Sequence, residues 1–204
     1  MKKLWRSVVA LCIVGFGCTG LAGAAPVTFG FTGTVTDDPF SISSFGAPIS
    51  GSFSFDSAAP DGIANPANGS FASIGPGFGF SVMVHGTLYS SFGGLTVNTA
   101  NNISSGDQYG VIASDALITL ELFLQDGTGL ALTSDALPTL PPMLSAFAFR
   151  QFRLFSDDAE FLGTVDTLVC TAGCTVAEPG SLGLVLAALT FLWLPLQTAR
   201  RRSQ

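Results

Sequence analysis

The sequence predicts an all-β protein, an antiparallel β-sandwich of the jelly-roll type, held between two membrane-targeting segments. Three observations indicate this fold class. Apolar residues alternate with polar ones at period two over many short runs. Glycine, proline, asparagine and aspartate interrupt these runs at spacings of roughly 8 to 15 residues, as turns between strands do. No amphipathic helical repeat of useful length lies between the two ends of the chain.

Residues 1–24 have the pattern of a secretory signal peptide. The segment opens with three positive charges, continues with the apolar run Val8 to Phe16 and ends with Ala22-Gly23-Ala24, which predicts cleavage after Ala24. A lipoprotein signal ending at Cys18 is the alternative, but it lacks the branched apolar residue that such signals usually carry three positions before the cysteine. The Sec translocon and signal peptidase are therefore expected partners.

The C-terminal residues divide into three parts in a fixed order. Ala177-Glu178-Pro179 comes first, an uncharged apolar run over 180–199 follows, and Arg200, Arg201 and Arg202 form a basic cluster within the tail 200–204. A helix of this length rises about 30 Å, which matches the hydrocarbon core of a bilayer. The run therefore predicts a transmembrane helix, and the arginines predict that its C-terminal end stays in the cytoplasm.

This tail resembles the C-terminal sorting signal of the PEP-CTERM proteins of Gram-negative bacteria. In that family, Pro-Glu-Pro precedes an apolar segment and an arginine cluster, and a membrane protease, exosortase, is thought to cut the signal. The resemblance covers Glu178, Pro179, the apolar run and the three arginines, and it departs at Ala177, where the family usually has proline. The alternative is an ordinary C-terminal anchor with a stop-transfer cluster.

Between the two signals we expect a β-sandwich ectodomain over 25–169, followed by a stalk and sorting motif over 170–179. Aromatic residues dense enough to form a core support a folded domain, since 16 of the 18 phenylalanines lie there. The longer predicted strands begin near Phe29, Ile49, Phe78, Leu117, Phe147 and Phe161. The spacing of Phe149 and Phe152 breaks the alternation, which predicts a β-bulge between them.

The charge distribution excludes one class of partner. All 14 acidic residues lie between Asp37 and Glu178, where the only basic residues are Arg150 and Arg153. The exported part therefore carries a formal charge of −12 and repels phosphate backbones, so we expect no nucleic-acid partner.

The mature chain would keep two of the four cysteines, Cys170 and Cys174. Because disulfides form outside the cytoplasm, these two predict a short local disulfide that stiffens the stalk.

No residue pattern indicates catalysis or a cofactor. His85 is the only histidine, it precedes Gly86 at a turn position, and no nucleophile motif accompanies it. One histidine and two cysteines fall short of a zinc site. The pairs Asp37-Asp38 and Asp157-Asp158 have ligands that suit Ca²⁺, but solvated turn residues are the favoured interpretation.

The sequence therefore predicts a non-enzymatic exported protein, held transiently in the inner membrane, processed by exosortase and delivered to the cell surface or to an exopolysaccharide matrix such as a biofilm. The alternative is a membrane-anchored periplasmic or surface module that binds carbohydrate or calcium. Sugar-binding platforms usually expose tryptophan or tyrosine, and only Tyr89 and Tyr109 remain in the domain.

Overall fold

β-Strands make up most of the computed structural model, which describes residues 26–39, 44–157 and 159–174. Over these residues eight strands follow one another along the chain, and a 3₁₀ turn, η2 (Leu144–Ala146), precedes the seventh. The strands are β1 (Pro26–Asp37), β2 (Pro48–Asp56), β3 (Asn68–Val84), β4 (Thr87–Ile103), β5 (Gly106–Ser114), β6 (Ile118–Asp126), β7 (Phe149–Ser156) and β8 (Glu160–Ala172).

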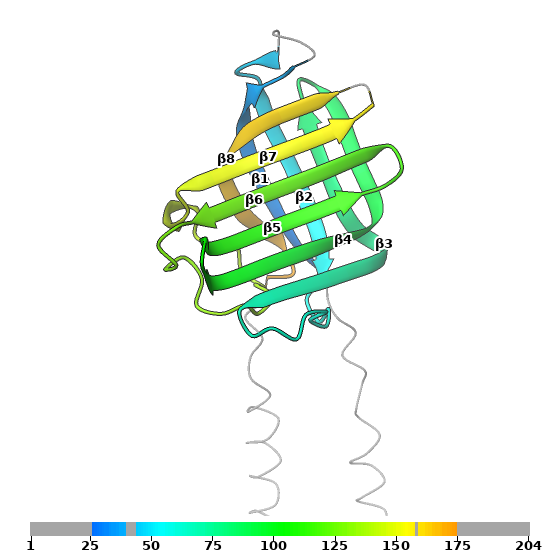
Figure 1. Cartoon of the computed structure of the whole chain (residues 1–204). Coiled ribbons are helices and arrows are strands. Elements are labelled where there is room, and N and C mark those ends of the chain that lie inside the picture. The colour runs from blue at the N-terminus through cyan, green and yellow to red at the C-terminus, as the bar shows by residue number, and fades with distance from the viewer. Residues whose placement is uncertain (1–25, 40–43, 158, 175–204) are drawn as a thin grey trace, which may run out of the picture.

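The strands form one closed antiparallel barrel in which each strand pairs with the next and β8 pairs with β1 (Figure 1). Closure places Phe31 of β1 opposite Leu168 of β8, and Gly33 opposite Val165. An eight-stranded barrel has an interior just wide enough for side chains to fill. The inside of this barrel is therefore the hydrophobic core.

Phenylalanine rings from strands distant in the sequence meet inside the barrel. Phe29 of β1 contacts Phe53 and Phe55 of β2 edge to face, with ring centroids 5.6 and 5.3 Å apart. Phe80 of β3 lies 6.2 Å from Phe152 of β7, which joins two sides of the barrel. These five rings are fully buried, as the period-two alternation of most of these strands predicts.

Glycines form a corner in the long hairpin of β3 and β4. Gly75, Gly77 and Gly79 have positive φ angles of 130°, 94° and 156°, and Gly93 opposite them has a φ of 106°. The pairing of the two strands shifts register between Ile74 and Gly79. Only glycine adopts such angles readily, so the corner lets both strands bend while the hairpin stays paired.

The predicted β-sandwich is wrong, because the structure is a single closed barrel rather than two packed sheets. Alternation within a strand shows which side chains point inward, and sandwiches and barrels share that pattern. The pairing of β1 with β8 closes the sheet into a barrel, and the sequence pattern does not report that pairing. The bulge predicted between Phe149 and Phe152 is also wrong, since β6 and β7 pair without a break from Ile118 to Gln125. Phe149 instead lies on the outer surface, where it is 45% exposed.

Two buried carboxylates hold the long connection between β6 and β7 against the barrel. Asp107 is fully buried and accepts hydrogen bonds from the backbone N–H groups of Asn102 and Leu132, both at 2.7 Å. Asp126 accepts from the Thr128 hydroxyl at 2.6 Å and from the Leu130 N–H at 3.0 Å. The Thr128 hydroxyl, followed by the N–H groups of Leu130 and Thr128, lowers the pKa of Asp126 to about 2.

The described residues contain no helix with the length and apolar character needed to span a bilayer. The transmembrane helix predicted over 180–199, the signal peptide over 1–24 and the basic tail over 200–204 lie outside the described residues.

Candidate functional site

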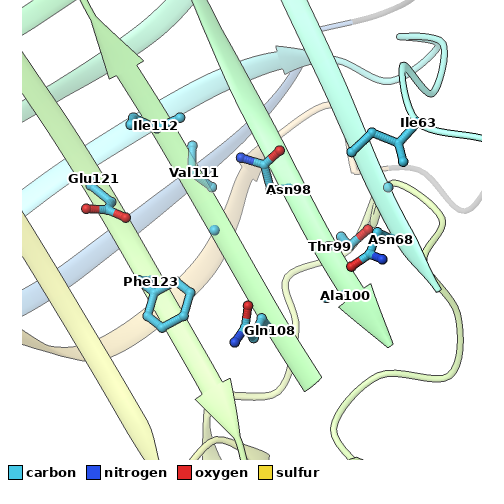
Figure 2. Close-up of a pocket in the computed structure, with 12 residues that line it drawn as sticks. Ile63, Asn68, Asn98, Thr99, Ala100, Gln108, Val111, Ile112, Glu121 and Phe123 are labelled. Atoms are coloured by element: carbon cyan, nitrogen blue, oxygen red, sulfur yellow. The ribbon is translucent and has the colours of Figure 1, made fainter. Parts of the chain in front are cut away.

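A groove of about 340 Å³ lies on the outer surface of the barrel (Figure 2). We call it the outer groove. Its floor crosses β4 and β5 at Asn98, Gly110 and Gln108, and Phe123 and Glu121 of β6 line one side. Ile63, from the connection between β2 and β3, lines the other. The volume lies at the lower end of the range for small-molecule sites, which are mostly apolar with a few convergent polar groups.

Gly110 creates the hollow in this surface. Its cross-strand partners are Asn98 on β4 and Phe123 on β6, so one side chain is missing from a row of outward-facing residues. A β-carbon at position 110 would have only the Phe123 ring within 4 Å, at 3.7 Å. Neither packing nor backbone conformation therefore requires glycine here. The consequence of glycine at this position is open space beside an aromatic ring.

Asp61 fixes the wall that carries Ile63. The Asp61 carboxylate accepts hydrogen bonds from the N–H groups of Ile63 at 2.9 Å and Ser70 at 3.0 Å. The hydrogen bonds from Ser70 and Ile63 hold the pKa of Asp61 below its usual range. This part of the chain is further joined to β4 by the bond from the Asn101 N–H to the Ala67 carbonyl, at 2.9 Å. The side of the outer groove that carries Ile63 is thus held to β3 and β4 by hydrogen bonds.

The outer face of β4 to β7 is almost free of net charge, although the domain is strongly acidic. The outward positions of these strands carry one ion pair, Arg153 with Glu121, whose atoms lie 3.6 Å apart, and Arg150 is exposed at the start of β7. The Arg153 guanidinium also stacks over Phe155, 4.7 Å from the ring centroid. The remaining outward residues are apolar, hydroxyl or amide residues, including Asn98, Gln108, Gln125 and Gln151.

His85 lies in an exposed turn, as its sequence context predicts. His85 and Gly86 connect β3 to β4 with φ angles of 51° and 80°. Positive φ at both central positions is the mark of a type I′ hairpin turn. The position of His85 is therefore explained by the turn.

The tyrosines are poorly placed to stack on a ligand. Tyr109 is fully buried in the core, and burial raises the pKa of its hydroxyl. Tyr89 is half-buried and packs edge to face on Phe161, with centroids 6.0 Å apart. Phenylalanine supplies the outward aromatic surface instead, through Phe123 and Phe149, whose centroids are 6.1 Å apart.

Cys170 and Cys174 form the disulfide that the sequence predicts. It closes a short loop at the end of β8, where Thr28 of β1 pairs with Ala172. Gly173 lies directly against the Pro26 carbonyl. The two ends of the barrel chain therefore leave the fold side by side.

Three of the four acidic residues considered for Ca²⁺ lie within the described residues. Asp37 and Asp157 are exposed, Asp38 is 9% exposed, and Asp158 lies outside the described residues. Within the described ranges, no three histidine, cysteine or acidic side chains gather closely enough to hold a metal ion.

The two processing signals cannot be placed in this fold. The cleavage residues Ala22 and Ala24, the motif Ala177-Glu178-Pro179 and the cluster Arg200 to Arg202 all lie outside the described residues.

Sequence reasoning missed the outer groove. A weak signal was present, since Gly110 interrupts the outward positions of a strand that otherwise alternates. The pairing of that strand with Phe123 and Asn98 is a tertiary fact that the sequence alone does not contain.

Comparison of the chain with protein-family models, with curated proteins and with solved structures found no match.

Proposed function

We propose that the chain is an exported, non-enzymatic β-barrel protein that an exosortase recognises through its C-terminal signal. Processing would release it from the inner membrane to the cell surface or to an exopolysaccharide matrix. In this proposal Glu178 and Pro179 are read at the outer face of the membrane, and Arg200 to Arg202 fix the orientation of the apolar run.

The observation that carries the proposal is where the barrel begins and ends relative to the two signals. β1 starts at Pro26, just after the predicted cut at Ala24, and β8 ends at Ala172. The disulfide closes at Cys174, three positions before Ala177. Both signals therefore lie outside the barrel, and cleavage at either one would leave all eight strands of the described fold intact.

Intact-mass measurement of the protein from its native host tests the proposal. The expected product begins at Ala25 and lacks the residues after about Pro179. Glu178→Ala should retain the tail, whereas Thr175→Ala, outside the motif, should be processed normally. A mature protein that ends in Gln204, or equal processing of both variants, would overturn the proposal.

The second candidate function is a surface or periplasmic module that binds carbohydrate or Ca²⁺. The outer groove favours carbohydrate, because it has a half-buried aromatic ring beside amide groups and a single carboxylate that is already paired with arginine. A rise in melting temperature on addition of Ca²⁺ would favour the metal instead.

A further inference from the structure

We propose that the outer groove binds a linear, neutral polysaccharide chain that lies across strands β4 to β7. This inference develops the carbohydrate-binding candidate above and does not depend on cleavage of the C-terminal signal. The mass measurement and the binding measurement below therefore succeed or fail separately.

The groove belongs to a continuous row of outward-facing residues that crosses several strands. Asn98 pairs with Gly110, Gly110 with Phe123, Phe123 with Gln151, and Gln151 with Thr164 of β8. Neighbouring strands lie about 4.8 Å apart, so the row from β4 to β8 is about 19 Å long. A row of that length accommodates several sugar rings in a line, which favours a polymer over a single sugar.

A second hollow lies farther along the same row. It has a volume of about 280 Å³ and is lined by residues that include Phe149, Gln151 and Thr164, together with one residue of each charge, Arg150 and Asp166. The edge-to-face pair of Phe123 and Phe149 stands between the two hollows. An aromatic pair flanked by two depressions fits a chain whose apolar ring faces lie on the aromatic side chains while neighbouring units settle on either side.

The polar groups of the groove match sugar hydroxyls, which both donate and accept hydrogen bonds. An amide side chain does the same through its NH₂ and its carbonyl oxygen. The Asn98 side chain makes no hydrogen bond within the described part of the chain, and it is exposed in the groove. Gln108 donates to the Ser105 hydroxyl at 3.0 Å, which positions its amide without using its carbonyl oxygen.

Other classes of ligand fit this surface poorly. An anionic polymer would meet a domain of strong negative charge, in which Arg153 is paired with Glu121 and Arg150 shares the second hollow with Asp166. A peptide strand needs a free sheet edge, whereas β4, β5 and β6 are hydrogen-bonded to a strand on each side through this region. A cation would find one carboxylate, Glu121, in the groove.

Gly110 provides the sharpest test, because a side chain there would fill the groove without disturbing the strand. The full-length protein would be solubilised in a polyoxyethylene detergent, which presents no sugar. Calorimetry would then follow titration with neutral linear oligosaccharides from two to six sugars, built on β-1,4-glucan, β-1,3-glucan, α-1,4-glucan and β-1,4-mannan. An oligogalacturonide of the same length is the anionic comparison.

We expect at least one neutral series to bind, with affinity rising about tenfold or more from the disaccharide to the hexasaccharide. Gly110→Val and Phe123→Ala should each weaken binding of the hexasaccharide about tenfold or more. Ser50→Val places an isopropyl side chain at an exposed position of β2 and should leave binding unchanged. Asn98→Ala, which removes an exposed side chain, repeats the test if Gly110→Val lowers the melting temperature.

Three results would overturn the proposal. The first is no binding of any neutral hexasaccharide up to about 10 mM. The second is unchanged binding in the folded Gly110→Val or Asn98→Ala variants. The third is tighter binding of the oligogalacturonide than of every neutral chain.

Discussion

Gly33 of β1 packs so closely against Thr164 of β8 that a β-carbon at position 33 would overlap the Thr164 carbonyl oxygen. Because the overlapping atom belongs to the backbone of Thr164, no side-chain rotation can relieve the clash. Gly33→Ala should therefore push β1 and β8 apart at the seam of the barrel and destabilise the protein by about 2 kcal/mol or more. Urea unfolding measures this change.

Gly110→Ala is the matched control, because the new methyl group would touch only the Phe123 ring at 3.7 Å. Its free energy of unfolding should stay the same or rise by up to about 1 kcal/mol, since alanine restricts the unfolded chain more than glycine does. If Gly33→Ala and Gly110→Ala lowered the free energy of unfolding equally, that result would contradict the difference in packing between positions 33 and 110.

Asp107→Ala should loosen the connection between β6 and β7. The substitution leaves the N–H groups of Asn102 and Leu132 without their acceptor, and we expect a loss of about 3 kcal/mol in unfolding free energy. Asp107→Asn keeps one carbonyl oxygen and should lose about half as much. Asp157→Ala, at an exposed position, should change stability by less than about 0.5 kcal/mol. Hydrogen exchange at Leu132 checks the mechanism, because its amide should exchange faster in Asp107→Ala than in Asp157→Ala.

Acid should weaken the same connection through Asp126. Its pKa is about 2 in the folded protein, against about 3.9 in an unfolded chain. A lowered folded-state pKa stabilises the protein fully above the unfolded value, and this stabilisation is lost as pH falls from about 4 through 2. Asp126→Asn, which does not titrate, should flatten the fall in unfolding free energy over this pH range. Parallel pH profiles for the two proteins would contradict this assignment.

Removal of the disulfide should have a modest effect. The bond between Cys170 and Cys174 closes a loop of only a few residues at the exposed end of β8, so the double variant Cys170→Ser/Cys174→Ser should be less stable by about 2 kcal/mol. Dithiothreitol should lower the melting temperature of the parent protein and leave that of the double variant unchanged. A larger loss than this would show that the disulfide supports the barrel rather than its terminus.

Strand positions were largely predictable from the sequence, and the way the strands assemble was not. Phe29, Phe31 and Val35 alternate with polar residues and point into the core as expected. The alternation of apolar and polar residues depends only on a residue and its near neighbours in the chain. It can therefore be predicted without knowing how the strands pair. Closure instead depends on β1 meeting β8, and no local pattern reports a partner so distant in the chain.

The outward aromatic residues show the same limit. The sequence predicted Phe149 and Phe152 on one face by way of a bulge, whereas β7 alternates without a break and Phe149 lies outward. A phenylalanine does not by itself say whether it packs inward or forms a surface for a ligand. The hollow at Gly110 depends on the register of β4, β5 and β6, which places Asn98 and Phe123 on either side of Gly110. That register cannot be read from the sequence of any one strand.

Ring closure also sets an order of events during biosynthesis. Thr32 and Thr167 bond through their hydroxyls at 2.7 Å across the seam, although they lie 135 positions apart. Until the segment carrying Thr167 has been synthesised, β1 and β7 each present a row of unpaired backbone groups that invites aggregation. Contacts this distant in sequence form late and slowly. A nascent chain would therefore need protection, for example by a chaperone, until its last strand arrives.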